Sequence, residues 1–200
     1  MGLAKNYFKD FDVEERIDEK GRRKKILIYK GNTWTIQVDQ KKLLPRKIAF
    51  LAIALLMTGA GIAGNLQNAA GNRAGVAAAA GLIAFVPMFL VLYSCIYSLI
   101  LKTPVLQRAQ YRETSLFMKI GAAAVCILAL TAVVGHIVLV VVGRIPEERS
   151  LEIASAILWG VAALASAVLF IWEMKTEYVQ KRKDGTIVRK ERFRRGSETY

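Results

Sequence analysis

The chain has 200 residues, of which 54% are hydrophobic, and it carries a formal net charge of +13. Soluble domains contain roughly 45–50% apolar residues, so this composition argues against an ordinary soluble domain. The basic excess alone would suit a nucleic-acid-binding protein, but it is concentrated around long apolar runs and accompanies no nucleic-acid-binding motif. No Asp or Glu occurs from Gln40 to Arg112, which indicates segments embedded in lipid.

The N-terminal tail, residues 1–47, contains a hairpin signal at about residues 25–38. The apolar stretch KILIYK is followed by Gly31-Asn32 and then by TWTIQV, in which apolar and polar residues alternate. A Gly-Asn pair between two such runs is typical of a β-hairpin. The tail has no apolar h-region, so a cleavable signal peptide is not expected.

Four apolar segments are long enough to cross a bilayer as helices, which takes about 20 residues. They are residues 48–64, 77–101, 120–142 and 153–172, and the loops between them are residues 65–76, 102–119 and 143–152. None of the four has a charged residue at its centre, where a charge would cost about 2.5–3.5 kcal/mol. The sequence therefore predicts an all-α polytopic membrane protein with four transmembrane helices.

The distribution of Lys and Arg predicts the orientation of these helices. Of the 29 Lys and Arg residues, 26 lie in the two tails and in the loop of residues 102–119, and 3 lie in the other two loops. Basic loops remain in the cytoplasm. We therefore expect both termini to be cytoplasmic (N-in/C-in) in a multi-pass protein of a cell membrane, and the pattern fits a bacterial inner membrane.

The C-terminal tail, residues 173–200, carries a second hairpin signal at about residues 177–193, where Asp184-Gly185 separates two strand-like runs. Because a lone hairpin is marginally stable in water, we expect the two tails to pack into one small cytoplasmic β element. The alternative is two independent flexible tails.

Several basic residues near the predicted membrane surface are candidates for contact with an anionic inner leaflet. These candidates are Arg46, Lys47, Lys181, Arg182 and Lys183. The alternative is that they serve orientation alone, through the bias of basic residues toward the cytoplasm.

The stretch GAGIAG at residues 59–64 matches the pattern G-x-G-x-x-G. Nucleotide binding by this pattern requires a preceding strand and an acidic residue about 20 positions further on. Here an apolar helical run precedes it and no acid occurs before Glu113. We therefore interpret these small residues as places where helices pack closely. The candidate packing residues are Ala60, Gly61, Gly64, Gly81 and Gly160.

His136 is the only histidine and lies in the third predicted span, toward its outer end. An ionisable group within a membrane is a functional candidate, with a structural hydrogen bond to a neighbouring helix as the alternative. Tyr93, Ser94 and Tyr97 form a polar group in the second span. They are candidates for a polar cavity, although tyrosines also anchor helices at the membrane interface.

No catalytic motif, metal-ligand pattern or cofactor motif is recognised, so no catalytic, metal-binding or cofactor-binding residue is assigned. We expect a non-enzymatic interaction, scaffold or accessory subunit with a protein partner or self-association through its spans or tails. Nucleic acid is not an expected partner. The alternative function is a small-solute permease or channel that uses the Tyr93/Tyr97 face and His136.

Overall fold

The computed structural model describes residues 11–17, 23–73, 75–101, 103–142, 149–182 and 187–191, with side chains between residues 29 and 182 of these ranges. The described chain divides into two compact units. The larger comprises Val38–Lys102 and Arg112–Thr176, and the smaller includes residues up to Gln37, Thr103–Tyr111 and residues from Glu177 onward.

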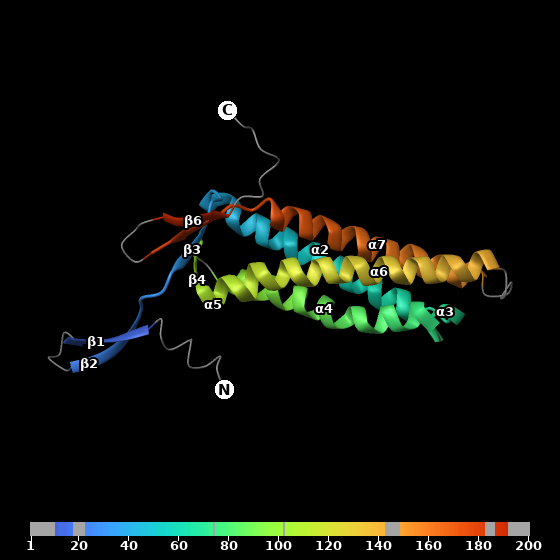
Figure 1. Cartoon of the computed structure of the whole chain (residues 1–200), viewed down its shortest axis with the longest axis horizontal. Helices are drawn as coiled ribbons and strands as arrows, with labels where there is room; N and C mark the ends of the chain where they lie inside the picture. The colour runs from blue at the N-terminus through green and yellow to red at the C-terminus, as the bar shows by residue number, and fades with distance from the viewer. Residues whose placement is uncertain are drawn as a thin grey trace, which may run out of the picture. The chain divides into compact units, whose positions relative to one another are not determined.

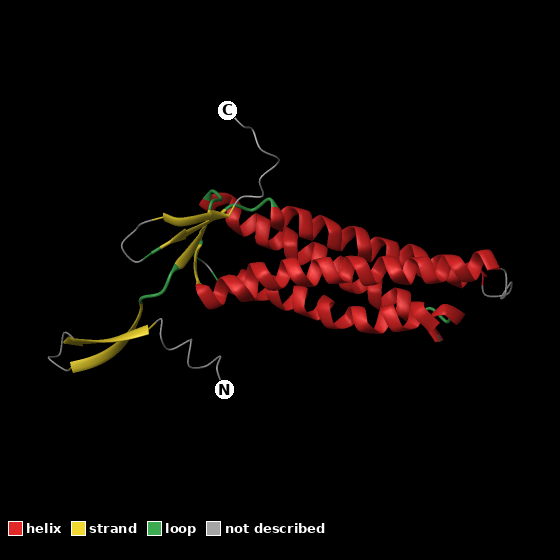
Figure 2. Cartoon of the chain, viewed as in Figure 1, coloured by secondary structure: helices red, strands yellow, loops and turns green. Residues whose placement is uncertain are grey.

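Four long helices, α2 (Gln40–Leu66), α4 (Gly75–Ile100), α6 (Phe117–Val142) and α7 (Arg149–Met174), form the larger unit. They run side by side in Figure 1 and are the red ribbons of Figure 2. Each is long and apolar enough to cross a membrane. The prediction of a mostly helical chain with four membrane-spanning helices is therefore confirmed.

The four helices form a closed ring. Helices α2 and α6 each pack against α4 and α7, as in an antiparallel four-helix bundle. We call the end where α2 and α6 finish and α4 and α7 begin the distal end, and the opposite end the proximal end. The short helix α3 (Ala70–Arg73) lies at the distal end and packs against α4 and α6.

The helices extend beyond the predicted apolar segments because their ends are polar but still helical. Helix α2 begins at Gln40, where the side chain of Asp39 accepts a hydrogen bond from the backbone N–H of Lys41, a typical N-cap. Helix α7 covers residues 149–174 instead of 153–172. This extension brings Glu152 and Glu173, which lie outside the predicted span, into the helix.

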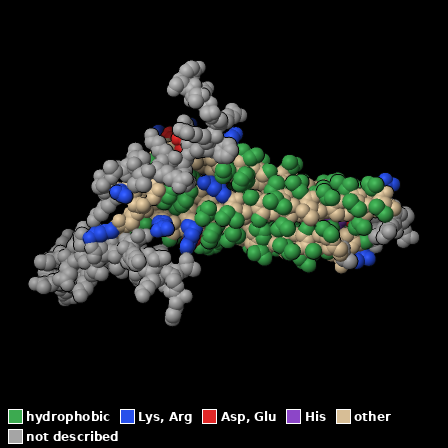
Figure 3. All heavy atoms as spheres, in the orientation of Figure 1, with side chains coloured by type: hydrophobic (Ala, Val, Ile, Leu, Met, Phe, Trp, Pro, Cys, Tyr) green, Lys and Arg blue, Asp and Glu red, His purple; other side chains and the backbone are tan. Residues whose placement is uncertain are grey.

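The interior of the bundle consists mainly of alanine, with a few large side chains between the small ones. The largest buried apolar side chains include Trp159, Met57, Met88 and Leu169, each with no exposed surface. Many leucine, isoleucine and valine side chains point outward, and hydrophobic atoms cover the face of this unit seen in Figure 3. Such an exterior suits lipid as the surrounding solvent.

In the smaller unit, a four-stranded antiparallel sheet has the order β4-β3-β5-β6. Its strands are β3 (Thr33–Ile36), β4 (Val105–Gln107), β5 (Tyr178–Lys181) and β6 (Ile187–Glu191). The sheet therefore joins both tails and the loop between α4 and α6. Its central side chain, Trp34, stacks on Tyr111 of the short helix α5 (Arg108–Tyr111) with ring centroids 4.3 Å apart.

The N-terminal strands pair differently from the predicted hairpin of residues 25–38. Strand β2 (Arg23–Tyr29) pairs with β1 (Phe11–Ile17), and β3 belongs to the other sheet. A two-residue hairpin turn needs positive φ angles, and among the described residues only Gly75 has one. Gly31 and Asn32 therefore form a connection between two sheets. At the other end of the chain, β5 and β6 pair within the predicted range of residues 177–193.

Candidate functional site

A buried histidine–glutamate pair lies at the distal end of the bundle. Glu152 sits in the first turn of α7, 1% exposed, and His136 lies near the end of α6 with no exposed surface. The Nδ1 atom of His136 is 2.6 Å from Oε2 of Glu152. Two ionisable side chains buried together need each other as partners, because an unpaired charge in the interior is costly.

The loop between α2 and α4 supplies the second partner of this carboxylate. The backbone N–H of Gly71 in α3 donates to Oε1 of Glu152 at 2.9 Å. A Cβ atom on Gly71 would lie 2.7 Å from His136 Nδ1 and 2.9 Å from Glu152 Oε2. A side chain at this position would therefore collide with the histidine–glutamate pair, and glycine lets α3 close over it.

Asn72 fixes the same loop to the end of α2. Its side-chain Nδ2 donates to the carbonyl oxygens of Gly64 at 2.7 Å and Gln67 at 2.9 Å. The last carbonyl groups of a helix lack partners within the helix, so Asn72 caps α2. Asn72 Nδ2 also donates to the hydroxyl of Ser155 in α7, at 3.3 Å, so the loop is tied to both helices.

Three inward-facing residues of α7 carry this site. Glu152, Ser155 and Trp159 are separated by three and four positions, which places them on one helix face. All three are buried. Sequence reasoning missed this stripe because Glu152 was placed in a loop, although the spacing of Glu152, Ser155 and Trp159 could have indicated an inward polar face.

Four side-chain atoms around this site are buried and have no hydrogen-bond partner within the described part of the chain. They are His136 Nε2, Trp159 Nε1, Asn65 Nδ2 and Asn72 Oδ1. Buried polar atoms are almost always paired in proteins. This concentration of unpaired atoms at one end of the bundle is therefore the most unusual chemical feature of the described residues.

Two glycines of GAGIAG receive large side chains from neighbouring helices. A Cβ on Gly61 would lie 2.6 Å from Met88 Cε, and one on Gly64 would lie 3.1 Å from Trp159 Nε1. The candidate packing residues Ala60 and Gly81 are also buried. In contrast, a Cβ on Gly160 would meet no atom within 4 Å.

Sequence reasoning did not select two other glycines that mark the contact between α4 and α6. A Cβ on Gly135 would lie 2.8 Å from the Cβ of Ala77, and one on Gly121 would lie 2.7 Å from Cγ2 of Val91. The two glycines are 14 residues apart, or two heptads, which places them on one helix face. This spacing of 14 residues was the feature of the sequence that could have identified them.

The polar residues of α4 lie far from His136. Because Ala77 lies against Gly135 and Val91 against Gly121, the two helices are antiparallel. Tyr93 is therefore level with the start of α6, about 25 Å along the bundle from His136 at 1.5 Å per residue. Tyr93 is exposed and stacks on Tyr97 with ring centroids 5.8 Å apart. Ser94 is buried and bonds the carbonyl of Leu90.

A second buried carboxylate, Glu173, lies at the proximal end. Its Oε1 accepts from the hydroxyl of Ser115 at 2.6 Å, and its Oε2 accepts from Arg46 at 3.2 Å. Ser115 is presented by a π-helical turn, η1 (Arg112–Leu116). Arg46 also bonds Thr176, and the buried Lys47 bonds the carbonyl of Leu101. Unlike Arg46 and Lys47, which make these contacts inside the bundle, Lys181 and Arg182 are exposed; Lys183 lies outside the described residues.

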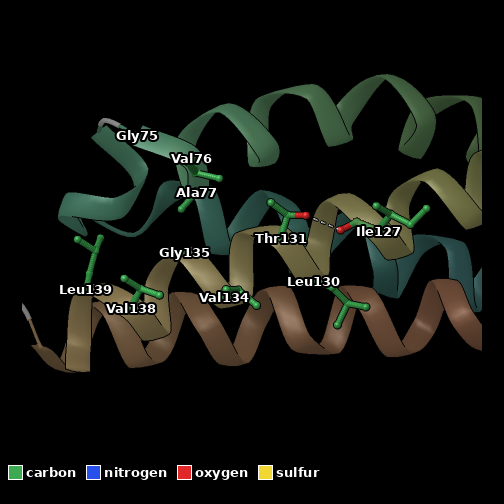
Figure 4. A pocket seen from close by; sticks show the side chains of 10 residues that line it. All are labelled: Gly75, Val76, Ala77, Ile127, Leu130, Thr131, Val134, Gly135, Val138 and Leu139. Carbon is green, nitrogen blue, oxygen red and sulfur yellow. Dashed lines mark hydrogen bonds between the residues drawn. The ribbon is translucent and has the colours of Figure 1, made fainter. Parts of the chain in front are cut away.

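A groove of about 680 Å³ lies between the start of α4 and the distal half of α6 (Figure 4). The side-chain hydroxyl in its lining belongs to Thr131 and donates to the carbonyl of Ile127 at 2.9 Å. A groove with such an apolar side-chain lining suits a hydrocarbon chain. Its lining comprises Gly75, Val76, Ala77, Ile127, Leu130, Thr131, Val134, Gly135, Val138 and Leu139.

Comparison of the chain with models of protein families, with curated proteins and with solved structures finds no match.

Proposed function

We propose that the chain is a non-enzymatic interaction or accessory subunit of a membrane, and that it presents the four-stranded sheet to a protein partner. One observation carries this proposal: the sheet is assembled from three segments that leave the same, proximal end of the bundle. Tails that served only to orient the spans would not need a common folded structure.

The sheet depends on the bundle for its formation. Strands β3 and β5 pair directly, from Thr33 opposite Lys181 to Ile36 opposite Tyr178, although the whole bundle separates them in sequence. Closing such a long loop carries a large entropic cost in an unfolded chain. A folded bundle offsets that cost, so a partner that binds the sheet would recognise only the assembled protein.

The outer edge of β4 is closed to further strands by its own neighbours. The hydroxyl of Thr103 donates to the carbonyl of Val105, and the backbone N–H of Gln107 donates to the side chain of Gln110. Edge strands protected in this way resist pairing with another chain. The proposed contact is therefore made through exposed side chains, among them Val105, Lys181 and Arg182.

The alternative function, a small-solute permease or channel, draws less support from the geometry. The Tyr93/Tyr97 face and His136 lie at opposite ends of the bundle. Between these ends, the interior is filled by side chains without exposed surface, including Met57, Met88 and Trp159.

The proposed location is a bacterial inner membrane with the sheet in the cytoplasm. The basic bias of the proximal segments supports this orientation. The exposed Lys181 and Arg182 suit an anionic leaflet, where each basic residue contributes about 1 kcal/mol.

The test compares partners that co-purify in mild detergent with the wild-type chain and with two alanine variants. Trp34→Ala removes the centre of the sheet, a change that costs about 3–5 kcal/mol for a buried tryptophan. Leu82→Ala shortens a side chain on the exposed surface of α4 that is 65% exposed. We expect Trp34→Ala to lose a partner that Leu82→Ala retains. Co-purification of the same set of proteins with the wild-type chain and with both variants would contradict the proposal.

A further inference from the structure

The distal end of the bundle contains hydrogen-bonding groups that the described protein leaves unused. His136 and Trp159 have no exposed surface, and the atoms His136 Nε2 and Trp159 Nε1 have no partner. Asn65 Nδ2 and Asn72 Oδ1 are buried and unpaired as well. An unmade hydrogen bond at a buried atom is costly, so a group of four points to a bound molecule.

The chemistry of three of these atoms is fixed by their surroundings. The indole N–H of Trp159 can only donate. The Asn72 side chain already donates through Nδ2 to two carbonyl groups, so its free atom is the acceptor oxygen. His136 faces Glu152 through Nδ1, which leaves Nε2 as its unused position in either protonation state.

Three of these side chains, Asn65, Asn72 and Trp159, lie around Gly64 and Gly81. Trp159 Nε1 lies 3.1 Å from the position a Cβ would take on Gly64, and Asn72 bonds the carbonyl of the same residue. A Cβ on Gly81 would meet both Asn65, at 2.8 Å, and Trp159, at 2.9 Å. The glycines therefore let these polar side chains approach one another closely.

We propose that this distal site binds a small uncharged molecule that carries a hydroxyl or amide group. Such a group offers a donor to Asn72 and an acceptor to Trp159, and His136 can pair with either. A charged ligand fits less well, because the carboxylate of Glu152 is already paired with His136 and Gly71. The same chemistry is available from a free solute or from the headgroup of a lipid. This inference goes beyond the proposed docking of a partner and does not depend on it.

The experiment uses the full chain labelled with ¹⁵N-tryptophan in lipid nanodiscs. The chain has three tryptophans, so Trp34 and Trp172 are internal references for Trp159. Glycerol and acetamide are the soluble probes, and phosphatidylglycerol is the lipid probe, with phosphatidylcholine as the matrix without a donor headgroup. We expect the indole signal of Trp159 alone to move, and to saturate, with at least one probe.

The two sources give different results. A free-solute site responds to glycerol or acetamide in phosphatidylcholine, whereas a headgroup site responds to phosphatidylglycerol without added solute. Either response supports the proposal. A Trp159 signal that exchanges with water but moves with none of the three probes would overturn it, because water alone would then satisfy these atoms.

Matched variants locate the response. Gly64→Ala places a methyl group beside the Trp159 indole nitrogen and changes no polar side chain, so it should abolish the shift. Gly59→Ala adds the same methyl group to the same helix, where no atom lies within 4 Å, and should leave the shift intact. His136→Gln should weaken binding about tenfold, as expected for one lost hydrogen bond. A shift of unchanged size in the Gly64→Ala chain would assign the response to another place.

Discussion

At the scale of single residues, the distal end depends on the contact between a glycine and a buried histidine–glutamate pair. Gly71 donates its backbone N–H to Glu152, and a side chain at this position would collide with both Glu152 and His136. The loop can therefore satisfy the buried carboxylate only because this residue has no Cβ. The interaction links three elements, α3, α6 and α7, through a single carboxyl group.

We expect Gly71→Ala to lower the free energy of unfolding in detergent by about 1–3 kcal/mol, the usual cost of overpacking a filled interior. Gly59→Ala is the matched control, because its methyl group meets no atom and alanine is favoured over glycine in a helix by about 1 kcal/mol. Thermal unfolding should therefore separate the two variants in opposite directions. Equal melting temperatures for the two alanine variants would show that Gly71 is not confined as described.

Of the two residues in this pair, His136 could be selected from the sequence and Glu152 could not. His136 is noticeable because it is the only histidine of the chain and lies within an apolar segment. Glu152 lies at the polar start of α7, where hydropathy cannot distinguish a loop from a helical turn that faces inward. The partners Gly71 and Asn72 were beyond prediction for the same reason, since they come from a loop whose position depends on the packing of four helices.

At the scale of elements, local sequence patterns identified which segments form strands, but they did not identify which strands pair with one another. The alternation in TWTIQV marks β3 correctly as a strand, with Trp34 facing inward. Its neighbours β4 and β5 come from segments separated from it by one helix pair and by the whole bundle. No periodicity encodes such pairing, because it follows from where the helices end.

A disulfide scan tests the register of β4 against β3. Thr35 lies opposite Val105, and the neighbouring Ile36 N–H donates to Pro104, so Thr35 and Val105 form a pair without backbone hydrogen bonds. Their Cα atoms should be about 4.5 Å apart, within the disulfide range of about 4.4–6.8 Å. We expect the Thr35→Cys/Val105→Cys chain to cross-link under mild oxidation, as read by peptide mapping.

The control for this scan is the diagonal pair Thr35→Cys/Gln107→Cys, whose residues lie about 7–8 Å apart. It should cross-link far less than the directly opposed pair. Preferential linkage of the diagonal pair would mean that β4 is shifted along β3.

At the scale of the whole molecule, two buried carboxylates mark the ends of one membrane-spanning helix. Glu152 and Glu173 are 21 positions apart in α7, or about 32 Å at 1.5 Å per residue. This separation is close to the roughly 30 Å thickness of the hydrocarbon core of a bilayer. Each carboxyl group has a nitrogen partner near one end of the helix, Glu152 in His136 and Glu173 in Arg46.

Hydropathy was sufficient to predict the four long apolar helices, because crossing a bilayer imposes such helices whatever their packing. The order of the helices in the ring and the extension of α7 to include both carboxylates were not predictable, since they depend on contacts between alanine-rich faces.

The most direct test of the account is the labelling of single cysteines in sealed right-side-out vesicles with a membrane-impermeant maleimide. Arg73→Cys reports the distal loop and Lys181→Cys reports the sheet; both positions are exposed. The unmodified chain controls for the native Cys95 and Cys126, which lie within α4 and α6. We predict immediate labelling at position 73, and labelling at position 181 only after detergent is added. Labelling of both positions from the same side would contradict four membrane crossings, because residue 73 follows one long helix and residue 181 follows four.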